Sequence, residues 1–128
     1  MEYDDNFKQY RFEDLEVWNL SMKIVHEAYG LTAKFPHDEL FGLTNQLKRA
    51  TVSVSLNIAE GSGQSTDKSF LLYLRRARAS TLECVACIKI AIQENFIEES
   101  AIQTPNDLLK KEYFKLVALE KSIANKSS

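Results

Sequence analysis

The sequence has few residues that interrupt a helix. Only two prolines and four glycines occur among its 128 residues, so the chain has few places to turn and long stretches that can stay helical. No apolar run approaches the roughly 18 to 20 residues that span a bilayer, and we expect no membrane segment. The acidic start, residues 1–5, lacks the basic and then apolar pattern of a secretion signal. These absences predict a cytoplasmic protein.

Cysteine and histidine are also scarce, which argues against the common metal sites. Cys84 and Cys87 form a Cys-x-x-Cys pair within a long helical stretch, and only His26 and His37 could complete a four-ligand zinc site. Buried thiols are the better interpretation, because free cysteine behaves as a small apolar residue. The chain also lacks a Glu-x-x-His pair, a glycine-rich phosphate loop and a nucleophile with an evident base. We therefore expect no enzyme, no cofactor, no metal and no small-molecule substrate.

Apolar residues instead repeat at helical spacing in four stretches, which predicts an all-α protein, an up-and-down four-helix bundle without strands. The expected helices, two of them capped by Ser65 and Thr104, cover residues 13–34, 39–60, 66–94 and 105–125. Gly61 is expected to end the second helix in the left-handed conformation, and Asn95 to cap the end of the third. The expected domain boundaries are an extension at 1–12, the bundle at 13–125 and a frayed end at 126–128.

Each expected helix has one apolar face that would form the core. The residues on these faces are Val17, Ser21, Ile24, Ala28, Leu31 and Phe35; Leu43, Leu47, Ala50, Val54 and Ile58; Phe70, Leu74, Ala77, Thr81, Val85, Ile88 and Ile92; and Leu109, Tyr113, Leu116, Val117 and Ile123.

The second and third helices also have an apolar face on the opposite side. Its residues are Val52, Leu56 and Ala59 on one helix and Leu72, Ala79, Ala86 and Ile90 on the other. This second stripe either widens the core or meets another subunit. We favour an interface with a second copy of the chain, because the second stripes occur on neighbouring helices.

Positive charge is concentrated in the middle third of an otherwise acidic chain. The net charge is −2, yet residues 43–80 contain six Lys/Arg against two Asp/Glu. Four of these cations lie off the main apolar stripes and could bind the phosphates of a nucleic acid, namely Lys48, Arg49, Arg75 and Arg76. Arg78 instead lies near the centre of the core stripe, where a charge needs a partner. We expect an ion pair with Glu60 or Glu83, which the sequence does not distinguish.

Five segments of the sequence are distinctive in combination. They are FEDLEVW at 12–18, FGLTNQLKRA at 41–50, NIAEG at 57–61, STDKSF at 65–70 and ARASTLE at 77–83. Together they resemble the four-helix bundle family of 23S rRNA intervening-sequence proteins, which also includes the accessory variability determinants of diversity-generating retroelements. The resemblance covers about residues 11–97.

This resemblance implies an up-and-down bundle that assembles into a homopentamer. For the members found beside retroelements, it also implies binding to nucleic acid and to a reverse transcriptase. The sequence departs from the family pattern at Ser55-Leu56, where Pro-Ser is usual, and at Gln64, where a basic residue is common. Gln64 and the overall acidity argue against nucleic-acid binding. We therefore expect a non-enzymatic, homo-oligomeric scaffold that engages protein partners, with a nucleic-acid-binding accessory protein as the alternative.

Overall fold

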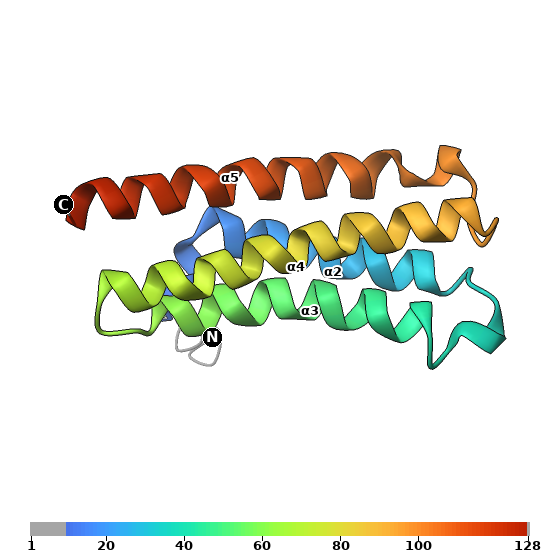
Figure 1. Ribbon diagram of the computed structural model, residues 1–128, viewed down its shortest axis with the longest axis horizontal. Coiled ribbons are helices and arrows are strands. Elements are labelled where there is room, and N and C mark those ends of the chain that lie inside the picture. Colours follow the sequence, from blue (N-terminus) through green and yellow to red (C-terminus); the bar gives the residue numbers. More distant parts are fainter. Residues whose placement is uncertain (1–9, 128) are drawn as a thin grey trace, which may run out of the picture.

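The computed structural model describes residues 10–127, and every regular element in that range is a helix (Figure 1). The long helices are α2 (Glu16–Thr32), α3 (Leu43–Ser62), α4 (Asp67–Gln93) and α5 (Gln103–Ser127). Short 3-10 helices are η1 (Arg11–Asp14), η2 (His37–Glu39) and η3 (Glu99–Ile102). Helix α3 packs against α2 and α4, and α5 closes the bundle against α4 and α2. Successive connections lie at alternate ends of the bundle (Figure 1), which confirms the predicted all-α, up-and-down four-helix bundle.

The core consists mainly of the predicted apolar faces. Most of the predicted residues are buried, including Leu47, Ile58, Leu74 and Leu116, which have no exposed surface. The residues that are only partly buried are Leu43, Val85, Ile92, Tyr113 and Val117. The thiols of Cys84 and Cys87 are also buried and free, as the sequence predicts.

The packed part of the chain begins earlier than the predicted boundary at residue 13. The guanidinium of Arg11 donates a hydrogen bond to the Ser62 carbonyl (3.2 Å) and lies 5.0 Å from the centre of the Phe70 ring. Phe12 packs edge-on against Trp18, with the ring centres 4.8 Å apart. Extended backbone at Leu15 separates this short 3-10 turn from α2, so the predicted single helix from residue 13 is divided. Residues 1–9 of the predicted extension lie outside the described part of the chain.

The connection between α2 and α3 is longer than predicted. Helix α2 ends at Thr32, and α3 begins at Leu43 rather than at residue 39. The intervening 3-10 turn gives way to α3 at Gly42, whose φ of −110° and ψ of −115° break the helical geometry. The Glu39 carboxylate accepts a hydrogen bond from the Leu43 amide (3.1 Å), which satisfies one of the free N–H groups at the start of α3.

Gly61 does not end α3 in the left-handed conformation, so this prediction is wrong. The helix continues to Ser62, and no glycine in residues 10–127 has a positive φ. Gly61 is instead needed because α3 and α4 approach closely. A Cβ atom at this position would lie 2.7 Å from the Cβ of Tyr73 and 3.0 Å from the ring of Phe70.

One predicted N-cap is displaced by one residue, the other lies inside its helix, and the predicted C-terminal cap is confirmed. Thr66 rather than Ser65 caps α4, accepting a hydrogen bond from the Ser69 amide at 3.1 Å. Helix α5 begins at Gln103, directly after η3, so Thr104 lies inside its first turn. Asn95 caps the end of α4 as predicted, and its φ of 62° is in the left-handed region. Helix α5 continues to Ser127, two residues beyond the predicted end of the bundle at residue 125, while residue 128 lies outside the described range.

Candidate oligomer and nucleic-acid interfaces

The second apolar stripes lie on the outside of α3 and α4 rather than in a widened core. The exposed fractions are 53% for Leu56, 46% for Leu72 and 48% for Ile90. The small residues of the same stripe, Ala79 and Ala86, are exposed as well. Val52 and Ala59 are partly buried. All seven residues of the predicted interface therefore retain surface that a second molecule could cover.

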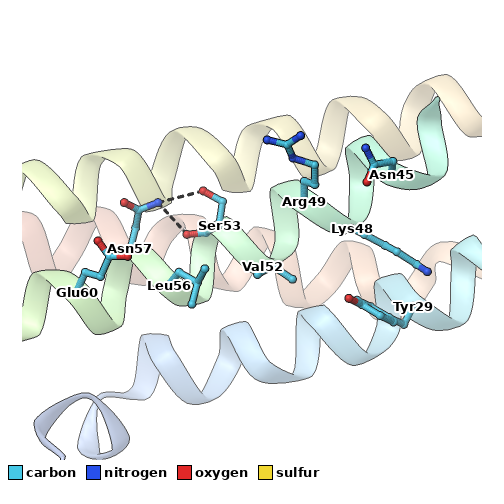
Figure 2. Close-up of a pocket in the computed structure, with 9 residues that line it drawn as sticks. All are labelled: Tyr29, Asn45, Lys48, Arg49, Val52, Ser53, Leu56, Asn57 and Glu60. Atoms are coloured by element: carbon cyan, nitrogen blue, oxygen red, sulfur yellow. Dashed lines mark hydrogen bonds between the residues drawn. The ribbon is translucent and has the colours of Figure 1, made fainter. Parts of the chain in front are cut away.

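A groove with a positively charged edge runs along α3 on the side facing α2 (Figure 2). This basic groove has a volume of about 460 Å³ and is lined by Tyr29, Asn45, Lys48, Arg49, Val52, Ser53, Leu56, Asn57 and Glu60. Lys48 extends toward α2, where its Nζ lies 4.7 Å from the centre of the Tyr29 ring. Such a contact is a cation–π interaction. Arg49 points the other way, toward α4, and the apolar side chains of Val52 and Leu56 lie farther along α3 than both cations (Figure 2).

Hydrogen-bonded polar side chains line the α4 side of the basic groove. The hydroxyl groups of Ser53 on α3 and Ser80 on α4 lie 2.9 Å apart. The Asn57 amide donates to the Ser53 hydroxyl at 3.0 Å and to the Ser53 carbonyl at 2.9 Å (Figure 2). The Ser53–Ser80 bond joins α3 to α4, and the two Asn57 bonds lie within α3 and fix the Asn57 side chain on this wall of the groove.

A second groove, with a negatively charged edge, lies at the end of the bundle that carries the α2–α3 connection. This acidic groove also has a volume of about 460 Å³ and is lined by Glu39, Phe41, Gly42, Leu43, Gln46, Ile90, Glu94 and Phe96. Phe41 is 92% exposed, more than any other large apolar residue of the described chain. Of the predicted interface residues, Ile90 therefore lines the acidic groove, whereas Val52 and Leu56 line the basic groove.

The four cations predicted to bind nucleic acid do not form one compact cluster. Because α3 and α4 are antiparallel and Ser53 lies opposite Ser80, Arg49 and Arg76 extend from that pair in opposite directions. Arg49 lies four residues from Ser53, and Arg76 lies four residues from Ser80. Arg49 and Arg76 are therefore separated by about eight residues, or roughly 12 Å along the bundle. Arg76 lies 5.0 Å from the Tyr73 ring centre, and Arg75 approaches Glu120 on α5 at 3.9 Å. Arg75 is thus directed to the α5 side, away from Lys48 and Arg49.

Comparison with known protein families assigns the chain to one of them. The profile of the 23S rRNA-intervening sequence protein family matches residues 13–117, which is most of the chain and includes α2, α3, α4 and the first part of α5. The chain belongs to this family. The comparison with curated proteins finds no match.

In this 23S rRNA-intervening sequence protein, the partner of Arg78 is Glu120 on α5. The Arg78 guanidinium donates two hydrogen bonds to the Glu120 carboxylate, Nε to Oε2 at 2.8 Å and Nη2 to Oε1 at 3.1 Å. The hydrogen bonds that Arg78 donates to Glu120 raise the pKa of Arg78. The predicted partners Glu60 and Glu83 are therefore wrong, because both lie on the α3–α4 side of the bundle. Glu83 accepts a hydrogen bond from Gln46, and Glu60 lines the basic groove.

A second acidic residue of α5 was not anticipated from the sequence. Glu112 is fully buried, and neither of its carboxyl oxygens has a hydrogen-bond partner. Burial, with a smaller contribution from the charge of Glu16, raises the pKa of Glu112 to about 8. The carboxyl group is therefore mostly protonated and neutral at pH 7. The sequence carries a signal for this position, because Glu112 lies three residues after Leu109 and four before Leu116, at the spacing of the core face.

The described residues contain no group of three His, Cys, Asp or Glu side chains that could hold a metal ion. Burial raises the pKa of Cys84 to about 12 and also raises the pKa of Cys87. Both groups are therefore thiols rather than thiolates at neutral pH. Among residues 10–127, no helix combines the length and the apolar character that crossing a membrane requires.

Proposed function

We propose that this protein is a non-enzymatic scaffold that assembles with copies of itself through the outer faces of α3 and α4. The observation that carries the proposal is the exposure of Leu56, Leu72 and Ile90 on two neighbouring helices. Exposed large apolar side chains of this kind are common in protein–protein interfaces. The family resemblance implies five copies, and the assembled faces would leave other surfaces free for protein partners.

The mass of the assembly tests this proposal. Size-exclusion chromatography with light scattering at tens of micromolar should give about five subunit masses. Leu56→Asp should shift the protein to smaller species, because an unpaired charge is costly in an apolar contact. Leu82→Asp is the matched control, since Leu82 is about equally exposed on α4 but lies outside the second stripe. A wild-type protein that runs as a monomer would refute the proposal.

A second function is favoured by the family description, which names an intervening sequence of 23S rRNA. We infer weak binding to nucleic acid through Lys48 and Arg49, whose groove has more positive than negative side chains. Phosphate-driven binding to duplex weakens with salt, with a log–log slope of about −0.9 per phosphate neutralised. Fluorescence anisotropy with labelled RNA and DNA at two salt concentrations measures this slope.

The separation of the cations along the bundle gives the control for this experiment. A Lys48→Gln, Arg49→Gln double variant should lose most of the binding, whereas Arg75→Gln with Arg76→Gln should lose less, since Arg75 already contacts Glu120. Absence of binding at low salt, or equal binding by all variants, would exclude a nucleic-acid role for the basic groove.

A further inference from the structure

The two grooves differ in charge and in shape, and both border the outer face of α3. The basic groove is a hollow that contains Lys48 and Arg49 against one carboxylate, Glu60. The acidic groove contains Glu39 and Glu94 without a lysine or arginine, and its edge carries the exposed ring of Phe41. A surface with a projecting ring and negative charge is complementary to a hollow with positive charge.

The Phe41 ring projects from a backbone that is held by hydrogen bonds. The Leu40 amide donates to the His37 carbonyl at 3.1 Å, and the Gly42 amide donates to the Glu39 carbonyl at 2.9 Å. The bond from the Leu43 amide to the Glu39 carboxylate fixes the same turn to the start of α3. Phe41 is thus presented in one place before binding, which reduces the entropy lost on association.

The floor of the basic groove suits an aromatic ring. Leu56 and Val52 supply apolar surface, and Tyr29 supplies a second ring on the α2 side (Figure 2). The volume of about 460 Å³ is ample for one phenyl side chain. Aromatic residues that fill such pockets dominate the binding energy of many interfaces.

From these observations we propose that Phe41 of one copy inserts into the basic groove of a second copy, between Tyr29 and Leu56, with the carboxylate of Glu94 near Arg49. This inference rests on the proposed self-association and deepens it, because it assigns the two sides of the contact. Each copy has one projecting ring and one groove at different places, so successive copies can join head-to-tail. Repetition of a head-to-tail contact builds a ring of more than two subunits when the rotation closes.

Complementation between two variants tests the head-to-tail contact. Phe41→Ser removes the projecting ring but keeps the groove, and Leu56→Asp removes the groove but keeps the ring. Each variant alone should run at a smaller mass than the wild type. An equimolar mixture should form a complex of two subunits, because one intact contact remains between the Leu56→Asp chain and the Phe41→Ser chain. Phe114→Ser is the control, since Phe114 is an exposed ring on α5 and its loss should leave the mass unchanged.

The outcomes separate this inference from the proposed function. A monomeric wild type refutes self-association and the Phe41 contact together. A wild-type oligomer whose mass is unchanged by Phe41→Ser refutes the Phe41 contact alone, as does a mixture of the two variants that fails to pair. Far-ultraviolet circular dichroism establishes that each variant is folded.

Cross-linking and charge exchange provide measurements that do not depend on losing the ring. A photo-reactive phenylalanine analogue at position 41 should cross-link to Tyr29 or to residues 48–60 of another copy, and a cross-link to any other segment would overturn the proposal. Arg49→Glu and Glu94→Arg should each raise the apparent dissociation constant, on the order of 10-fold, and the double variant should restore it toward the wild-type value. A double variant that is weaker than both single variants would exclude the proposed pairing.

Discussion

Replacement of Glu112 by glutamine should stabilise the fold at neutral pH, and the size of the effect should depend on pH. In the native protein the carboxyl group is buried without a hydrogen bond, and burial raises its pKa from the ordinary value of 4.5 to about 8. Unfolding returns the group to water, where it ionises readily. Between these two pKa values the native state therefore holds a proton that the unfolded state has released.

The sign follows from this difference in bound protons. Because the native state binds more protons than the unfolded state between about pH 4.5 and 8, the free energy of unfolding falls as pH rises through that window. Each pKa unit corresponds to about 1.4 kcal/mol, so burial of Glu112 makes the free energy of unfolding about 3 kcal/mol lower at pH 7 than below pH 4.5. Below pH 4.5 the group is protonated in both states, and above pH 8 it is ionised in both, so the dependence disappears at each end.

Glutamine has a similar shape but does not titrate in this range. We expect Glu112→Gln to exceed the wild-type free energy of unfolding by up to about 3 kcal/mol at pH 7 and by less than about 1 kcal/mol at pH 5. Urea denaturation followed by circular dichroism at pH 5, 6, 7 and 8 measures this, at one fixed protein concentration because association also affects stability. Glu99→Gln, at an exposed glutamate of η3 outside both grooves, is the control that should show no such trend. The reasoning would be refuted if the free energy of unfolding of Glu112→Gln differed from that of the wild type by the same amount at every pH.

Further measurements test the packing around two glycines, the Arg78–Glu120 pair and the cysteines. Gly61→Ala should lower the free energy of unfolding by about 1–3 kcal/mol through overpacking against Tyr73, whereas Gly30→Ala should raise it by about 0.5–1 kcal/mol, since open space surrounds that position. Both changes are measured by urea denaturation. Arg78→Met should cost about 1–3 kcal/mol because it leaves the Glu120 carboxylate buried and less well paired, and adding Glu120→Leu should recover part of that loss in the same assay. The thiols of Cys84 and Cys87 should react with a disulfide reagent far more slowly in the native protein than in urea, because both are buried and protonated; equal rates would contradict this assignment.

The helices and their core faces could be predicted because they depend on spacing along one chain segment. The stripe through Val17, Ile24 and Leu31, for example, needs only the period of the helix to be recognised, and these residues are buried. The cap at Asn95 was also predictable from local sequence, since an asparagine after a long apolar stripe often ends a helix in the left-handed conformation.

Other features depend on which helices meet, and the sequence does not contain that information in a local form. A glycine after an apolar stripe fits either a helix end or a close helix contact, and only the position of Phe70 and Tyr73 on α4 decides for the contact at Gly61. The partner of Arg78 is similarly set by the packing of α5 against α4. Glu112 and Glu120 could have been identified as core positions, because with Leu109, Leu116 and Ile123 they follow the helical spacing of one face. The exposure of Phe41 has no sequence signal, since it depends on the path of the connection before α3.

The order of the helices also bears on how the chain folds. Three of the interfaces join helices that follow one another in the chain, whereas the interface of α2 with α5 joins segments separated by the whole of α3 and α4. Contacts between distant segments must overcome a larger loop-closure entropy before they stabilise the chain. Docking of α5 also removes the Glu112 carboxyl from water, which makes this step less favourable as pH rises. We therefore expect α5 to be largely undocked in the folding transition state, so that truncation of Leu116 accelerates unfolding while truncation of Leu74 slows folding.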